Sequence, residues 1–133
     1  MNKKTILVVD DDEAILDSVA DALTGAGYRV VTAENGYAAV SAVARWNPAL
    51  IILDIDTPIM AGCSFLQIYS RVPEPRAGVI AMTETDATFE RAVVRCVSAC
   101  IEKPLEIDDL LATVERHFAS KDRPSGIRRF AFA

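Results

Sequence analysis

Short, continuous apolar runs alternate along this chain with stretches in which apolar residues recur at helical spacing. The runs are brief and rich in aliphatic residues, which is typical of strands buried on both faces of a sheet. They lie at residues 6–9, 30–31, 50–53, 79–82 and 100–101. The helical stripes between and after them are formed by Ile15, Val19 and Leu23, by Val40, Val43 and Ala44, by Phe65, Leu66, Tyr69 and Val72, by Phe89, Ala92, Val93, Cys96 and Val97, and by Ile107, Leu110, Leu111, Val114 and Phe118.

Helix-ending residues follow the first three of these stripes. They are, in chain order, Gly25 and Gly27, then Asn47 and Pro48, then Pro73. Five strand–helix pairs in regular alternation predict an α/β fold in which helices cover both faces of a parallel sheet. Because crossover connections are right-handed, we expect a doubly wound sandwich of five strands and five helices.

Length and composition favour one soluble domain. A chain of 133 residues, 51% of them hydrophobic, has room for one core and hardly a second. No apolar stretch approaches the roughly 18 residues of a membrane span, and the start lacks the pattern of a signal peptide. The three cysteines, Cys63, Cys96 and Cys100, are odd in number and lack CxxC spacing, which indicates free thiols in a reducing compartment. We therefore expect a cytoplasmic protein without a membrane partner.

Charge is divided unevenly along the chain. The formal net charge is −5, but residues 121–133 hold four basic residues and one acid, so residues 1–120 carry −8. An acidic body argues against direct nucleic-acid binding by this domain. The charge pattern predicts a domain over residues 1–120, followed at 121–133 by a basic C-terminal tail or a truncated linker.

Chemically active side chains stand where the predicted strands end. Ligand sites of doubly wound folds lie beyond the carboxyl ends of the strands. At these ends the sequence places Asp10, Asp11 and Asp12, then Ala33 and Glu34, then Asp54, then Thr83, and finally Lys103 and Pro104. These acids, the hydroxyl and the lysine are therefore expected to meet at one edge of the sheet.

Together these groups have the character of a phosphoryl-transfer site. Clustered carboxylates repel one another, and a hard divalent cation such as Mg²⁺ relieves that repulsion. Asp54 is placed to attack phosphorus and form an aspartyl phosphate, while Lys103 and the metal neutralise charge and Thr83 donates a hydroxyl. Asp12 has a plainer interpretation, because an acid at that point commonly caps the following helix.

Four motifs now carry a family resemblance. They are ILVVDD at residues 6–11, LIILDIDTPIMAG at residues 50–62, VIAMT at residues 79–83 and EKPL at residues 102–105. In this order and spacing they resemble the receiver (CheY-like) domain of two-component response regulators, over residues 4–119. The resemblance implies a flavodoxin-like, five-stranded parallel sheet of order 2-1-3-4-5.

The resemblance also implies a role for each matching residue. Asp54 matches the phosphoacceptor, which takes a phosphoryl group from the phosphohistidine of a histidine kinase and also contacts the metal. Asp10 and Asp11 match the acidic pair that holds Mg²⁺ (or Mn²⁺), and Asp56 matches the position whose backbone carbonyl ligates the same ion. Thr83 matches the switch hydroxyl.

Lys103 matches the lysine that contacts the phosphoryl group, and Pro104 stands where family members often have a cis peptide bond. The implied partners are a histidine kinase or a phosphotransfer protein, together with a downstream protein target or a missing output domain. A homodimer through the fourth and fifth helices is also implied. By this interpretation the chain is a signalling switch with self-phosphorylation and autodephosphorylation activity only, and it is no turnover enzyme.

Two departures from the family pattern leave alternatives open. Glu84 follows Thr83 where a small residue is usual, and Cys100 stands where an aromatic residue is usual. A constitutive, non-phosphorylated interaction module of the same fold is therefore the first alternative. A small aspartyl-phosphate phosphatase is the second, because DIDTP resembles the haloacid-dehalogenase motif, although Thr57 comes one residue too early for it.

Two further side chains have ordinary structural interpretations. His117 has charged neighbours on the last helical stripe and is expected to be an exposed helical residue. Trp46 has helical spacing and is expected to be a core or half-buried anchor.

Overall fold

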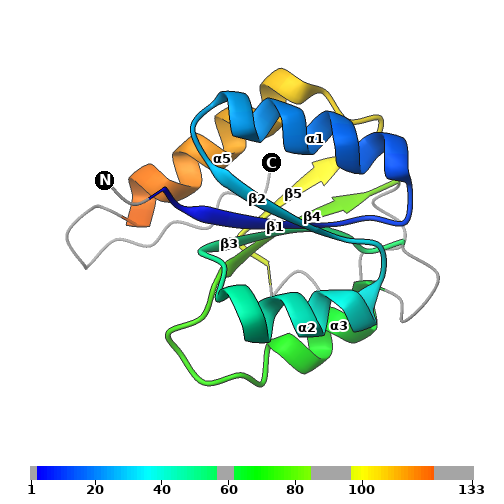
Figure 1. The fold of residues 1–133 in the computed structure, drawn as a ribbon, viewed down its shortest axis with the longest axis vertical. Helices are drawn as coiled ribbons and strands as arrows, with labels where there is room; N and C mark the ends of the chain where they lie inside the picture. The colour runs from blue at the N-terminus through cyan, green and yellow to red at the C-terminus, as the bar shows by residue number, and fades with distance from the viewer. Residues whose placement is uncertain (1–2, 57–61, 85–96, 122–133) are drawn as a thin grey trace.

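A five-stranded parallel sheet with helices on both faces forms the framework of the molecule (Figure 1). The computed structural model describes residues 3–56, 62–84 and 97–121. The elements are β1 (Thr5–Val9), α1 (Glu13–Gly25), β2 (Arg29–Ala33), α2 (Gly36–Trp46), β3 (Leu50–Asp54), α3 (Gly62–Tyr69), β4 (Gly78–Thr83), β5 (Ala99–Glu102) and α5 (Ile107–Lys121). The stripe predicted as a fourth helix lies mostly outside the described residues.

Strand order confirms the predicted topology. The sheet runs β2-β1-β3-β4-β5, and each neighbouring pair is parallel. Helices α1 and α5 lie on one face, and α2 and α3 lie on the other (Figure 1). Within the described residues, no helix has both the length and the apolar character that a membrane span requires.

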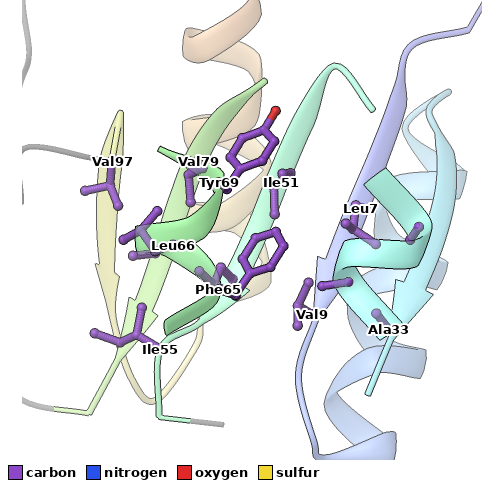
Figure 2. Close-up of a cluster of buried hydrophobic side chains, with 14 residues drawn as sticks. Leu7, Val9, Ala33, Ile51, Ile55, Phe65, Leu66, Tyr69, Val79 and Val97 are labelled. Atoms are coloured by element: carbon purple, nitrogen blue, oxygen red, sulfur yellow. The ribbon is translucent and has the colours of Figure 1, made fainter. Parts of the chain in front are cut away.

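Side-chain alternation along the strands builds two cores, one on each face. In β1, Leu7 and Val9 point toward α2 and α3, whereas Ile6 and Val8 point toward α1 and α5. Figure 2 shows the first core, where Phe65 stacks on Tyr69 with their ring centroids 5.8 Å apart. Because both faces of β3 are covered, all five of its residues are buried.

The residues that follow α1 and α2 end these helices as predicted, whereas α3 ends at Tyr69, before the predicted Val72. Helix α1 ends at Gly25, and Gly27 has a φ of 102°, which favours glycine. Helix α2 ends before Asn47, whose φ is 45°, and begins at the cap Asn35, whose Oδ1 accepts a hydrogen bond from the Ala38 N–H. Local sequence therefore determines where these two helices begin and end.

Helix α2 shows where the apolar stripe misled. Val40 and Trp46 are 41% and 44% exposed, and the buried face consists of Gly36, Ala39 and Ala42 instead. Small residues let the helix lie close to the sheet, so the bulkier Val40 and Trp46 turn away from it. Of the predicted stripe, Val43 packs against the core, but hydrophobicity alone misses the small residues that form most of the buried face.

His117 corrects a second expectation, because its ring is half-buried rather than exposed. It lies edge-on to Phe118, with centroids 5.2 Å apart, and occupies the space beside Gly78 at the start of β4. The missing side chain at Gly78 makes room for the ring. Helical spacing could not indicate this, since the two residues meet only in the folded chain.

Gly78→Ala is therefore expected to lower the free energy of unfolding by about 1–3 kcal/mol, as overpacking does. A Cβ at this position would overlap the His117 ring and lie 2.9 Å from Ser98 Oγ. Urea denaturation measures the change. Gly25→Ala is the matched control, because a Cβ there meets nothing within 4 Å, and stability should be unchanged or slightly higher. Equal effects of the two substitutions would contradict the argument.

Candidate functional site

Three carboxylates converge at the carboxyl edge of the sheet. Strands β1 and β3 are parallel neighbours, with Val9 paired to Leu53, so the residues that end them lie side by side. Asp10 and Asp54 are buried there, and the exposed Asp11 completes the group. One oxygen from each of the three lies within 4.8 Å of the other two. The structure thus brings together three of the acids that the sequence selects.

Lys103 provides the positive charge of this edge. It follows β5, and its Nζ lies 2.9 Å from Oδ1 of Asp54 and 3.9 Å from Oδ2 of Asp56. Its backbone N–H donates to the carbonyl oxygen of Thr83 at 2.8 Å, which ties the end of β5 to the end of β4. Burial disfavours the charge, but the hydrogen bond to Asp54 and the surrounding carboxylates outweigh it, so the pKa of Lys103 is raised. The lysine therefore stays charged.

Asp10 is a buried carboxylate with only one of its two oxygens hydrogen-bonded among the described residues. Its Oδ1 accepts a hydrogen bond from the Asp12 N–H at 2.9 Å, whereas its buried Oδ2 has no hydrogen-bond partner among the described residues. Burial raises its pKa to about 7, although the hydrogen bond from Asp12 lowers it, and the nearby charge of Asp54 raises it further. At neutral pH, part of the population therefore holds a proton on Asp10.

The donor set at this edge fits a hard divalent cation. Asp10, Asp11 and Asp54 offer carboxylate oxygens, the ligands that Mg²⁺ prefers, and among the described residues the buried Oδ2 of Asp10 has no hydrogen-bond partner. A bound Mg²⁺ would supply charge neutralisation for a phosphoryl group at Asp54. Binding would compete with the proton on Asp10, so the affinity for the metal should fall as the pH drops below about 7.

Asp12 belongs to the helix rather than to the site. Its Oδ1 accepts hydrogen bonds from the N–H groups of Ala14 and Ile15, at 2.9 and 3.3 Å, as the N-cap of α1. The predicted capping role of Asp12 is confirmed by this geometry, and the metal-binding roles of Asp10 and Asp11 stay predictions.

The side chain of Asp56 also contacts residues of this site, which the sequence did not indicate. Its N–H donates to Oδ1 of Asp54 at 2.9 Å, and its Oδ2 accepts from the Glu84 N–H at 3.1 Å. The prediction for Asp56 concerned its backbone carbonyl alone and stays a prediction. An acid two residues after Asp54 was the signal available, but its partner Glu84 is 28 residues away in sequence.

Thr83 and Pro104 lie at the same edge of the sheet, whereas Cys100 lies inside β5, paired with Ala81. Thr83 ends β4 and is completely buried. Cys100 is half-buried in β5, and the Lys103–Pro104 peptide bond is cis. Glu84, which departs from the family pattern, is exposed, and its backbone N–H donates to Asp56 of the site.

An apolar pocket of about 370 Å³ opens beside these charged groups, between α1 and the segment that joins β5 to α5. Asp10 and Lys103 line it at the charged end, and Ile15, Leu105 and Ile107 are among its apolar walls.

Comparison with known families adds independent evidence. Residues 6–115 match the family model described as response regulator receiver domain. The DNA-binding transcriptional regulator NtrC of Salmonella typhimurium is 35% identical over 134 residues, which cover 96% of this chain and 28% of that protein. The probable transcriptional regulatory protein TcrX of Mycobacterium tuberculosis is 30% identical over 109 residues, covering 80% of this chain and 46% of that one. The chain thus spans less than half the length of these relatives.

Solved structures agree with the family match. A CheY-like receiver domain from Methanospirillum hungatei superimposes with a TM-score of 0.80 at 27% identity, covering 91% of this chain and 98% of that one. The response regulator TrrA of Thermotoga maritima, solved in complex with Mg(2+)-BeF, gives a TM-score of 0.76 at 28% identity over 85% of this chain and 97% of that one. With its family model, its relatives and its fold in agreement, the chain belongs to the receiver domains of response regulators.

Proposed function

We propose that this domain is a switch operated by transfer of a phosphoryl group to Asp54. The observation that supports this most directly is the 2.9 Å contact between Lys103 Nζ and the buried Asp54 carboxylate, beside Asp10 and Asp11. A carboxylate oxygen of Asp54 forms a new P–O bond while the bond between phosphorus and the donor breaks. Lys103 offsets the charge of the group being transferred.

The donor we propose is the phosphohistidine of a histidine kinase or a phosphotransfer protein. In that reaction the P–N bond breaks and the imidazole leaves. Asp10 and Asp11 would hold Mg²⁺ with Asp54 and with the backbone carbonyl of Asp56, while the Thr83 hydroxyl would donate to the phosphoryl group. The acyl phosphate is later hydrolysed at the same site, so the domain modifies itself and turns over no free substrate.

We further propose that residues 1–120 act as the receiver unit in the cytoplasm and that 121–133 form a tail or a linker. The NtrC relatives are named DNA-binding transcriptional regulators, and this chain spans 28% of the first of them. An output domain outside that shared region, or a separate protein target, would carry the signal onward. A homodimer through the fourth and fifth helices would be another way to transmit the signal. Nucleic-acid binding by the acidic receiver itself is not expected.

Incubation with acetyl phosphate tests this proposal. We expect intact-mass spectrometry to detect one added phosphoryl group in Mg²⁺ and at least tenfold less in EDTA, because the clustered carboxylates need neutralising. No adduct, together with no Mg²⁺ binding in isothermal titration calorimetry, would favour the constitutive interaction module. Turnover of free phosphoesters would favour the phosphatase instead.

A further inference from the structure

The side chain of Asp56 bridges the ends of two strands beside the proposed acceptor. Its Oδ2 accepts a hydrogen bond from the Glu84 N–H at 3.1 Å and lies 3.9 Å from Lys103 Nζ. Lys103 in turn contacts Asp54 Oδ1 at 2.9 Å. The Asp56 carboxylate, which is not the proposed acceptor, therefore accepts from the Glu84 N–H and lies near the lysine that contacts the acceptor.

These donors are the kind that a phosphoryl group on Asp54 would require. Such a group would bring between one and two negative charges, carried on oxygens that need N–H or ammonium partners. Lys103 lies within hydrogen-bond distance of the Asp54 carboxylate, and the Glu84 N–H donates to the neighbouring Asp56 carboxylate. A phosphoryl group there would also be repelled by the negative Asp56. The two anions compete for the same partners.

We propose that the Asp56 carboxylate acts as an internal placeholder, which holds the Glu84 N–H and faces Lys103 until a phosphoryl group on Asp54 displaces it. This inference rests on the proposed function, since it assumes that Asp54 is the acceptor. It gives Asp56 a positioning role that slows entry of the phosphoryl group.

The exposure of the two acids is consistent with such a displacement. The Asp56 side chain is 32% exposed, against 3% for Asp54. Asp56 lies in the turn after β3, so its carboxylate can rotate into water without leaving a buried charge behind. The buried Asp54 has no such freedom.

Asp56→Ala removes the placeholder, and Asp56→Asn keeps an oxygen for the Glu84 N–H but removes the charge. With acetyl phosphate in saturating Mg²⁺, we expect the Ala variant to gain the phosphoryl group roughly 3- to 10-fold faster than the unaltered protein, as loss of one such competing interaction predicts. The Asn variant should be intermediate. Initial rates come from intact-mass spectrometry, after the Mg²⁺ affinity of each variant has been measured.

A second measurement needs neither metal nor phosphodonor. The amide resonance of Glu84 in the ¹⁵N-labelled protein should shift in Asp56→Ala, because that N–H loses its acceptor, and less in Asp56→Asn. Glu34→Ala is the matched control. It removes another exposed carboxylate from the same edge of the sheet, and it should change neither the resonance nor the rate by more than about twofold.

The outcomes distinguish a failure of the Asp56 placeholder from a failure of the proposed function. If the unaltered protein is phosphorylated but Asp56→Ala is no faster, or its Glu84 resonance does not move, the placeholder is refuted and the proposed function stands. If neither protein takes a phosphoryl group, the proposed function fails and the placeholder fails with it.

Discussion

Asp54→Asn is expected to abolish phosphorylation completely. The asparagine side chain keeps the shape of aspartate but has no anionic oxygen, and its nitrogen lone pair is delocalised into the carbonyl group. It is therefore no longer a nucleophile toward phosphorus. With acetyl phosphate and Mg²⁺, intact-mass spectrometry should find no phosphoryl adduct in this variant. The buried position of Asp54 and its contact with Lys103 make it the acceptor we expect.

A control of identical chemistry distinguishes the acceptor from the acids around it. Asp12→Asn makes the same change at the same edge, but Asp12 caps α1 and Asn caps helices equally well. That variant should be modified as readily as the unaltered protein. An adduct that persists in Asp54→Asn would place the acceptor elsewhere. Far-UV circular dichroism establishes that both variants are folded.

Asp10→Asn is expected to stabilise the metal-free protein in a pH-dependent manner. Burial raises the pKa of Asp10 from 3.8, the usual value for an aspartate in water, to about 7 in the folded state, so the folded protein holds this proton more tightly than the unfolded chain does. The unaltered protein therefore loses stability as the pH rises from about 4 to about 7, and the neutral amide avoids that loss. At one pKa unit per 1.36 kcal/mol, the gain should be about 4 kcal/mol at pH 8 and about 2 kcal/mol at pH 5.

Urea denaturation in EDTA at both pH values measures this difference. Mg²⁺ should then stabilise the unaltered protein and have little effect on Asp10→Asn, which loses a charged ligand. Asp12→Asn is the matched control, because it removes the exposed acid that caps α1 and leaves Asp10 in place. A difference between Asp10→Asn and the unaltered protein that is the same at pH 5 and pH 8 would mean that Asp10 does not titrate in this range.

Much of the site was accessible from the sequence because strand ends in a parallel sheet share one edge. Once 6–9 and 50–53 are recognised as buried strands, Asp10 and Asp54 must follow them on that edge. The division of the acids into a cap and a cluster also followed, since an N-cap needs one side chain and three were present. These inferences need only the chain direction and the position of each residue within its element.

What the sequence determined by itself was the element order, the helix ends at Gly25 and Asn47, and the acids and lysine of the carboxyl edge, because each depends on local periodicity, backbone preference or chain direction. Tertiary structure alone decided which face of α2 is buried, why His117 lies beside Gly78, and that Asp56 bonds to Glu84. These contacts join residues far apart in the chain, and their energies depend on the space and the partners that folding supplies. No local pattern encodes those distances.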